Sequence, residues 1–191
     1  MSSIVGDDGQ RRCGWAYGPP EYIAYHDDEW GRRVVGDDAV YERMVLEAFQ
    51  SGLSWITILR KREAFRAAFA RFSIEAVAAY TEADVERLLL DAGIVRNRAK
   101  IEASIANARA ALALTEGLSD LVWSFAPAGR RPAPRVMADV PAVTPASTAM
   151  ATELKRRGFR FIGPTTAYAH MQATGMVNDH LRDCIARPLC P

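Results

Sequence analysis

Apolar residues recur along most of this chain at the three- and four-residue spacing of an α-helix. One such stretch begins just after Ser54, a typical residue at a helix start, and contains Trp55, Ile58, Leu59, Phe65 and Phe69. Residues at these intervals lie on one face of a helix. No series of strands and no strand–helix–strand order stands out. The pattern therefore predicts an all-α fold.

Capping residues and glycines set the limits of the expected helices. Asp38, Ser73 and Thr81 precede helical patterns, and TEAD at Thr81 resembles a capping box. Gly52 and Gly93 follow such patterns and are expected to end them. The helices predicted in this way are 39–50, 54–69, 74–80, 81–90, 98–114, 147–157, 165–174 and 179–187.

The length of 191 residues favours a single domain over residues 1–191. Its one long irregular connection is expected at 126–147, which holds five of the ten prolines. Proline interrupts helices and interior strands, and connections of this length are uncommon in a compact domain and often functional. Residues 1–11 are expected to be flexible.

Composition excludes several classes of protein. Hydrophobic residues make up 49% and charged residues 25%, which argues against a disordered or fibrous chain. Three cysteines are too few for a disulfide scaffold. The longest stretch without charge, 161–178, contains Pro164, His170 and Gln172 and is no membrane span. The first residues show no signal-peptide pattern, so we expect a cytoplasmic protein.

The net charge of +1 hides an uneven distribution. Residues 1–50 hold ten acidic and five basic residues, whereas residues 51–191 hold thirteen and nineteen. The basic residues form three clusters: Arg60, Lys61, Arg62, Arg66 and Arg71; Arg96, Arg98 and Lys100; Lys155, Arg156, Arg157 and Arg160. Such clusters permit a local phosphate-binding face, although any one of them is explained equally by a solvated helix surface.

Soft metal ligands occur at both ends of the chain. Cys13 and His26 lie near the start, and His180 and Cys184, four residues apart, would share one face of a helix. Two sulfur and two nitrogen ligands suit tetrahedral zinc and leave no open position for water, so such a zinc would be structural. Two buried thiols and two ordinary histidines are the alternative. Cys190 is unassigned and is expected near a frayed end.

Residues 88–101 predict a hairpin of two helices with a turn at Gly93. The turn and the following helix start would present backbone N–H groups to a nucleic-acid phosphate without reading sequence. The nearby positive charges are Arg96, Arg98 and Lys100. An ordinary helical hairpin with a glycine cap is the alternative interpretation.

A third group combines aromatic and acidic residues. The N-terminal segment is rich in aromatic residues, namely Trp15, Tyr22, Tyr25 and Trp30. Glu47 lies in the apolar sequence MVLEAF, where an acid is costly unless it is paired or lines a site, and Trp55 follows. Aromatic faces beside a carboxylate suit a flat, electron-poor heterocycle. Alternatively, the aromatic residues belong to the core and Glu47 is exposed or paired with a cation.

These groups together resemble the DNA-3-methyladenine glycosylase I family. The matching segments are RCGWA (12–16), YIAYHDDEWG (22–31), LEAFQSGLSWITILRKRE (46–63), DAGIVRNRAKI (91–101) and GMVNDHLRDC (175–184). They occur in order and extend over nearly the whole chain. The resemblance implies a helix–hairpin–helix DNA glycosylase that hydrolyses the N-glycosidic bond of 3-methyladenine in alkylated double-stranded DNA. The products would be the free base and an abasic site.

The resemblance also implies roles for individual residues. One structural zinc would be held by Cys13, His26, His180 and Cys184. The base pocket would contain Glu47, Tyr25 and Trp55, with Trp15, Trp30 and Tyr22 nearby. Gly52 and Leu53 match the loop that approaches the gap left by the flipped nucleotide, and the hairpin with Gly93, Arg96, Arg98 and Lys100 would bind DNA.

The chemistry expected of such a site is simple. Alkylation makes the base cationic and weakens its glycosidic bond, so extrusion costs less and an aromatic pocket prefers the damaged form. Glu47 would accept a charge-assisted hydrogen bond from the base, as a catalyst or only in recognition. Lys100 is a doubtful nucleophile, so we expect a monofunctional glycosylase without a lyase step.

Two other functions remain open at this stage. A non-catalytic module that binds alkylated DNA would keep the pocket without the chemistry, although the presence of both Glu47 and Trp55 argues against it. A zinc hydrolase would need an open coordination position, which four protein ligands do not leave. All the parts lie in one chain, so a monomer suffices.

Overall fold

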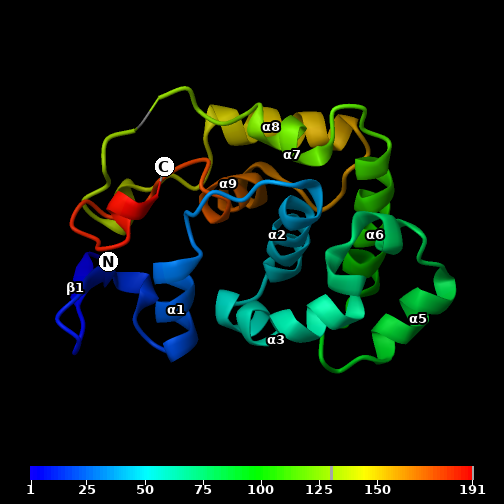
Figure 1. Cartoon of the computed structure of the whole chain (residues 1–191), viewed down its shortest axis with the longest axis horizontal. Helices are drawn as coiled ribbons and strands as arrows, with labels where there is room; N and C mark the ends of the chain where they lie inside the picture. Colours follow the sequence, from blue (N-terminus) through cyan, green and yellow to red (C-terminus); the bar gives the residue numbers. More distant parts are fainter. Residues whose placement is uncertain (130, 191) are drawn as a thin grey trace.

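Helices dominate the computed structural model, which describes residues 1–129 and 131–190 (Figure 1). The α-helices are α1 (Pro20–Asp28), α2 (Asp37–Gln50), α3 (Trp55–Ala68), α4 (Ile74–Ala78), α5 (Glu82–Leu90), α6 (Arg98–Leu112), α7 (Leu118–Trp123), α8 (Pro145–Arg156) and α9 (Pro164–Ala173). Four 3₁₀ turns are described: η1 (Gly14–Ala16), η2 (Ala70–Phe72), η3 (Met137–Asp139) and η4 (Arg187–Leu189). The mostly helical fold confirms the expected class.

Helix α2 lies at the centre of the molecule and packs against α3, α6, α7 and α9 (Figure 1). Its apolar positions recur at helical intervals and are buried from Val40 to Phe49. Phe49 contacts Phe65 of α3, with ring centroids 4.7 Å apart. The Tyr41 hydroxyl donates a hydrogen bond to the carbonyl of Ser104, which ties α2 to α6. The core therefore fixes the helices that carry Glu47 and the hairpin.

Several predicted helix starts are confirmed, and one has a different cap. Ser73 accepts a hydrogen bond from the backbone of Ala76, and Thr81 forms a capping box with Asp84. Asp38 lies inside the first turn of α2, where its carboxylate accepts the N–H of Ile74. It therefore attaches α4 to α2 instead of capping its own helix.

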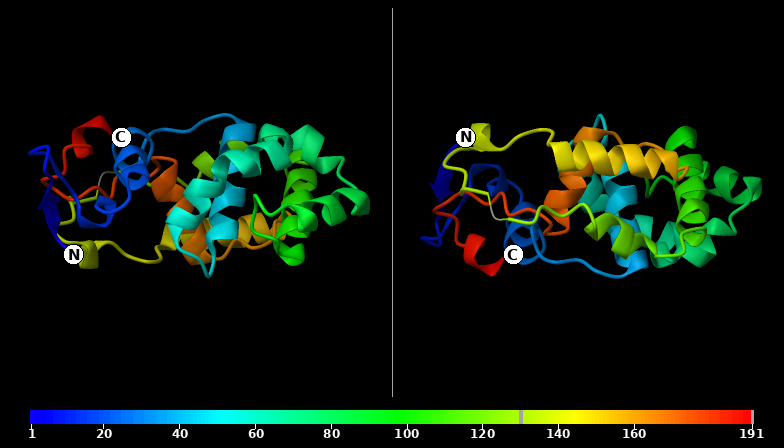
Figure 2. Two further views of the ribbon diagram at one scale, coloured as in Figure 1. Left: turned by 90° about the horizontal axis from the view of Figure 1, so that it is seen from below. Right: turned by 90° about the horizontal axis from the view of Figure 1, so that it is seen from above.

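Two short strands depart from a purely helical fold. Strand β1 (Ser3–Val5), within the segment expected to be flexible, pairs antiparallel with β2 (Arg11–Cys13), which begins at the end of that segment. The flexibility of residues 1–11 stays a prediction. The hairpin lies beside the C-terminal segment, at the same end of the molecule in all views (Figures 1 and 2). The Ile185 N–H donates to the Arg11 carbonyl, which joins the two ends of the chain.

The C-terminal segment corrects one prediction. Residues 179–187 form turns and bends followed by η4, so the helix expected there is wrong. The described part of 126–147 is irregular apart from η3 and the start of α8, as its prolines predict. No helix in the described residues is long and apolar enough to cross a membrane.

Candidate functional site

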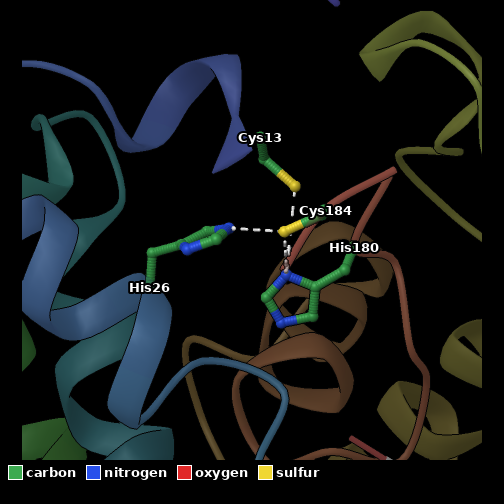
Figure 3. Close-up of side chains that lie close together, drawn as sticks. All are labelled: Cys13, His26, His180 and Cys184. Atoms are coloured by element: carbon green, nitrogen blue, oxygen red, sulfur yellow. Dashed lines mark hydrogen bonds between the residues drawn. The ribbon is translucent and has the colours of Figure 1, made fainter. Parts of the chain in front are cut away.

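Four metal-ligand side chains from opposite ends of the chain meet in one buried cluster (Figure 3). Cys13 ends strand β2 and His26 lies on α1, whereas His180 and Cys184 come from the irregular segment after α9. All four are buried, and their ligand atoms lie within 4.8 Å of one another. The structure thus brings together the complete set that the sequence singled out.

The spacing argument for His180 and Cys184 was wrong in one respect, because these residues do not lie on a helix. The Cys184 N–H donates to the Leu181 carbonyl in a turn instead. This turn leaves the Cys184 sulfur 3.5 Å from Nδ1 of His180. The expected neighbours therefore meet through a different local backbone.

Hydrogen bonds orient both imidazoles toward the sulfurs. His26 Nδ1–H donates to Asp27 at 2.7 Å, and His180 Nε2–H donates to the Trp30 carbonyl at 3.1 Å. The remaining ring nitrogens, His26 Nε2 and His180 Nδ1, then face Cys184 at 3.4 and 3.5 Å. Zinc ligands are commonly oriented by such outer partners. These two separations fit the S–N edges of a tetrahedron with Zn–S near 2.3 Å and Zn–N near 2.0 Å, and the whole donor set lies within 4.8 Å.

The thiols behave as a coupled pair. Hydrogen bonds from Cys13 first, and then from His180 and His26, hold the pKa of Cys184 well below its usual range. The neighbouring Cys184 and burial raise the pKa of Cys13. One thiolate forms readily and the second is opposed, as expected for like charges in contact. A cation among the four groups would permit both thiolates, so the donor set fits a zinc ion.

Two glycines let backbone segments pack closely around this cluster. Gly31 and Gly175 both have φ of +77°, a conformation that side chains oppose. A Cβ on Gly175 would lie 2.7 Å from the Gly31 carbonyl, and a Cβ on Gly31 would lie 3.1 Å from Nε2 of His180. Substitution at either position would displace the turn that carries His180.

The aromatic residues of the N-terminal segment connect the metal cluster to α3. Trp15 packs against Trp30 and His26, with ring centroids 5.0 and 5.2 Å away. Trp30 also contacts His180 at 4.6 Å, so it forms part of the wall of the metal cluster. The Tyr22 hydroxyl accepts the N–H of Ile56 and thereby caps α3, where the side chain of Ser54 does not.

A second site lies where α1, α2 and the start of α3 meet. Tyr25 and Trp55 pack with their ring centroids 5.2 Å apart. Glu47 of α2 is 7% exposed and makes no hydrogen bond among the described residues. Burial raises its pKa to about 7, against a smaller opposite effect of Arg43. The carboxyl group is therefore poised between its two forms at neutral pH.

Polar groups on the helices that pack with α2 also lack partners, as does one on α2 itself. They are buried atoms without a hydrogen bond in the described structure: Trp55 Nε1, Arg43 Nη1, and both ring nitrogens of His170. Buried polar groups are normally paired with protein, water or a ligand. A few polar groups without protein partners, together with aromatic side chains, are a feature of ligand-binding sites. Sequence reasoning singled out neither Arg43 nor His170 as a site residue.

The loop between α2 and α3 is exposed at Gly52 and Leu53, as a residue pair that approaches DNA requires. Gly52 has φ of +84°, and Leu53 is 40% exposed. Lys100 occupies a different place from the one expected. Its ammonium is buried and donates to the carbonyls of Phe49 and Ser51, so it supports this loop from behind and is not presented to DNA phosphate.

The predicted hairpin is formed by α5 and α6. Gly93 packs closely on α3, because a Cβ there would lie 2.9 Å from Ala64, and Lys61 donates to its carbonyl. Arg96 is exposed. Arg98 pairs with Glu82, Glu86 and Glu102, which offsets its charge.

A cavity of about 500 Å³ lies elsewhere, between the segment after α7 and the C-terminal segment. None of the predicted site residues lines it. This cavity is therefore separate from the two side-chain clusters described above.

Comparison with known proteins shows the family of the chain. The family model described as methyladenine glycosylase matches residues 15–187. The chain is 48% identical to DNA-3-methyladenine glycosylase 1 of Escherichia coli over 93% of this chain and 97% of that protein. It is 44% identical to DNA-3-methyladenine glycosylase of Haemophilus influenzae over 91% and 96%.

Solved structures agree as well. A crystal structure of 3-methyladenine DNA glycosylase I matches with a TM-score of 0.89 and 47% identity, covering 93% of this chain and all of that one. The Staphylococcus aureus enzyme, whose structure concerns 3-methyladenine recognition, matches with a TM-score of 0.88 and 33% identity, covering 93% and 96%. The fold is that of a helical DNA glycosylase. Within that class, the chain belongs to the methyladenine glycosylase family.

Proposed function

We propose that this protein hydrolyses the N-glycosidic bond of 3-methyladenine in alkylated DNA and leaves an abasic site. The observation that carries the proposal is the buried Glu47, whose carboxyl makes no hydrogen bond among the described residues and whose charge acts on Tyr25, the ring that packs on Trp55. Leaving such a group unpaired is costly, and a bound base would supply the missing donor.

The pocket favours an alkylated base for two physical reasons. A cationic ring is attracted to the faces of Tyr25 and Trp55 more strongly than neutral adenine is. The Glu47 carboxylate adds a charge-assisted hydrogen bond to the same form. Because alkylation already activates the leaving base, binding that strengthens toward the transition state accelerates bond breaking without a proton donor. We therefore propose a hydrolase without a lyase step.

DNA would reach this pocket from the side of the α2–α3 loop. This loop joins the helices that carry Glu47 and Trp55, and its exposed Gly52 and Leu53 are suited to occupy the gap beside an extruded nucleotide. The Gly93 turn and exposed Arg96 would hold the backbone without reading its sequence. Arg98 contributes less because acidic residues surround it, and Lys100 acts through the loop.

We also propose one structural zinc ion on Cys13, His26, His180 and Cys184. The donor set, its burial and its outer hydrogen bonds support a closed tetrahedral site. The ion would be bound by two side chains near each end of the chain and would hold these ends together. With four protein ligands it would carry no water for catalysis. Elemental analysis of the purified protein is expected to give one zinc per chain.

The expected setting follows from the same chemistry. The named relatives are bacterial enzymes, and the proposed substrate is chromosomal DNA, so we propose action in the bacterial cytosol. Both the base pocket and the metal site are built from one chain, which supports a monomer. No membrane partner is needed for any step.

The test is release of free base from methylated duplex DNA by wild-type protein and by Glu47→Gln. We expect the wild type to release 3-methyladenine and to spare 7-methylguanine. Loss of the charged hydrogen bond is expected to lower kcat/KM by about tenfold to a hundredfold, corresponding to roughly 1.5–3 kcal/mol. Glu75→Gln, on the exposed surface of α4, is the matched control and should behave as wild type.

The alternative is a module that binds alkylated DNA without cleaving it. If folded, zinc-loaded wild-type protein binds methylated DNA but releases no base, the glycosylase proposal is wrong and the binding module replaces it. If Glu47→Gln is as active as wild type, the glycosylase proposal holds but the proposed role of Glu47 is wrong.

A further inference from the structure

Arg43 and Glu47 share one face of α2. They are four residues apart on the helix, so their side chains lie one turn from each other. The Arg43 Nη2 atom donates to Glu29 at 3.0 Å, and Arg62 of α3 binds both oxygens of the same carboxylate at 2.6 and 2.8 Å. The guanidinium of Arg43 is thus held in place by α1 and α3, directly beside the proposed base site.

The fixed guanidinium keeps one nitrogen without a partner. Arg43 Nη1 is buried and donates no hydrogen bond to any group among the described residues. Across the α2–α9 contact lies His170, which is 2% exposed and whose two ring nitrogens also lack partners. The charge of Arg43 opposes the rise in the pKa of Glu47 and Tyr25 and adds to the fall in the pKa of His170.

The unpaired atoms complement one another. Arg43 Nη1 can only donate, the Glu47 oxygens accept, and a neutral imidazole offers one donor and one acceptor. They do not contact each other directly, and a polar site with two to four partners is where proteins hold ordered water. Water joining these groups would satisfy all three side chains.

We propose that Arg43 is a positioning residue of the base site, which acts on Glu47 through ordered water enclosed by His170 and keeps that side chain charged and oriented toward the base. This inference rests on the proposed glycosylase function. Arg43 would never touch the substrate. Its effect would be to supply a fixed positive charge behind Glu47, where burial alone favours the uncharged acid.

The charges facing Glu47 are few, which makes the effect of Arg43 separable. Arg43 lies on its own helix, Tyr25 and Glu29 belong to or follow α1, Arg62 lies on α3 and His170 on α9. Glu29 is offset by Arg62 even when Arg43 is removed. His170 stays uncharged near neutral pH, because burial lowers its pKa to about 4. Among the described residues, Arg43 supplies the charge that lowers the pKa of Glu47, so removing Arg43 leaves the effect of burial unopposed there.

The experiment measures kcat/KM for 3-methyladenine release against pH, using full-length protein and methylated duplex DNA. Arg43→Met is expected to move the acidic limb of the profile upward by about 1 unit, which lowers activity roughly fivefold at pH 7. Arg43→Lys keeps the charge and should keep the limb within a few tenths of a unit. His170→Phe excludes the water and should move the limb in the same direction as Arg43→Met.

The double variant distinguishes a shared path from two separate effects. Arg43→Met with His170→Phe should shift the limb no further than Arg43→Met alone, because both remove one connection. An unmoved limb in His170→Phe overturns the role of the water, and this arm decides even if Arg43→Met does not fold. A uniform loss at every pH in Arg43→Met shows a merely structural arginine. Wild-type protein that releases no base contradicts the proposed function instead.

Discussion

Glu47 illustrates how a single residue can be costly to the fold and useful to the site. Its carboxyl is buried on α2, and the described structure gives it no hydrogen bond. Arg43 offsets only part of the effect of burial on its pKa. A buried carboxyl without a hydrogen bond lowers the stability of the free protein, and the same carboxyl can bind a cationic base strongly. This arrangement links stability and function at one atom pair.

The cost predicts a pH-dependent gain in stability for Glu47→Gln. The folded pKa of Glu47 is raised from 4.5 to about 7. The stabilising contribution of the protonated form is therefore complete below pH 4.5 and is lost as pH rises through 7. As pH rises, the free energy of unfolding of wild-type protein falls by up to about 3 kcal/mol through this group. Glu47→Gln carries a neutral amide and does not lose it. Urea unfolding at pH 5 and pH 8 should show the variant gaining on wild type as pH rises.

The comparison between the two proteins removes other titrating groups. His170 has a folded pKa lowered to about 4, so its contribution is present above pH 6.5 and lost as pH falls toward 4, the opposite direction. It is common to both proteins and cancels in their difference. Glu75→Gln on the exposed surface is the control and should follow wild type at both pH values. A constant difference between Glu47→Gln and wild type would contradict the buried, raised-pKa carboxyl.

At the residue scale, sequence predicted the groups with unusual chemistry and missed those defined only by three-dimensional surroundings. An acid inside MVLEAF and cysteines paired with histidines contradict their local context and can be recognised. Arg43 occupies an ordinary polar position of an amphipathic helix, and its role depends on Glu29 and α9. No local pattern distinguishes such an arginine from a solvated one.

The α2–α3 loop and helix α6 behave as a unit at the scale of elements. Lys100 extends from the first turn of α6 to the carbonyls of Phe49 and Ser51, which end α2. These carbonyls have no following helical N–H to accept, and the ammonium satisfies them. The hairpin helix expected to bind DNA thus also sets the position of the loop that carries Leu53.

We expect Lys100→Met to loosen that loop. The buried Phe49 carbonyl and the more exposed Ser51 carbonyl lose a charged donor, which should cost roughly 1–3 kcal/mol. Hydrogen exchange at 51–54 should accelerate, and base release should fall with the less ordered loop. Lys155→Met, at an exposed position of α8, is the control and should change neither quantity. If Lys100 instead contacted a DNA phosphate, Lys100→Met would reduce the salt dependence of DNA binding by about one unit of slope and would leave hydrogen exchange in the loop unchanged.

Element boundaries followed from sequence where caps and periodicity agree, and failed where the chain is held by tertiary contacts. Helices α3 to α6 and α9 match their patterns closely. In the segment after α9, His180 and Cys184 have helical spacing, but the segment forms turns. There these two side chains meet Cys13 and His26. Strands β1 and β2 are too short for a period-two pattern to register. In these places long-range contacts override local preference.

The whole molecule is joined at its ends. Cys13 and Cys184 are separated by nearly the full chain, and the segments that carry them also share the hydrogen bond from Ile185 to Arg11. Closing so long a loop is entropically unfavourable until several contacts form together. A metal ion that binds all four ligands would make this closure cooperative with folding. The Trp15 and Trp30 contacts would then transmit that order to Tyr25 in the base site.

Removal of zinc should therefore destabilise the entire protein and not only its termini. A strong chelator, or Cys13→Ser, is expected to cost at least about 3 kcal/mol, which corresponds to a fall in Tm of roughly 10 °C for a chain of this size. Cys190→Ser is the matched control, because Cys190 is also buried near His180 but lies outside the ligand set. It should retain one zinc and a wild-type response to chelator. Two results together would contradict the zinc proposal: an equal loss of stability in Cys13→Ser and Cys190→Ser, and no zinc bound to wild-type protein. Packing alone would then hold the two ends of the chain together.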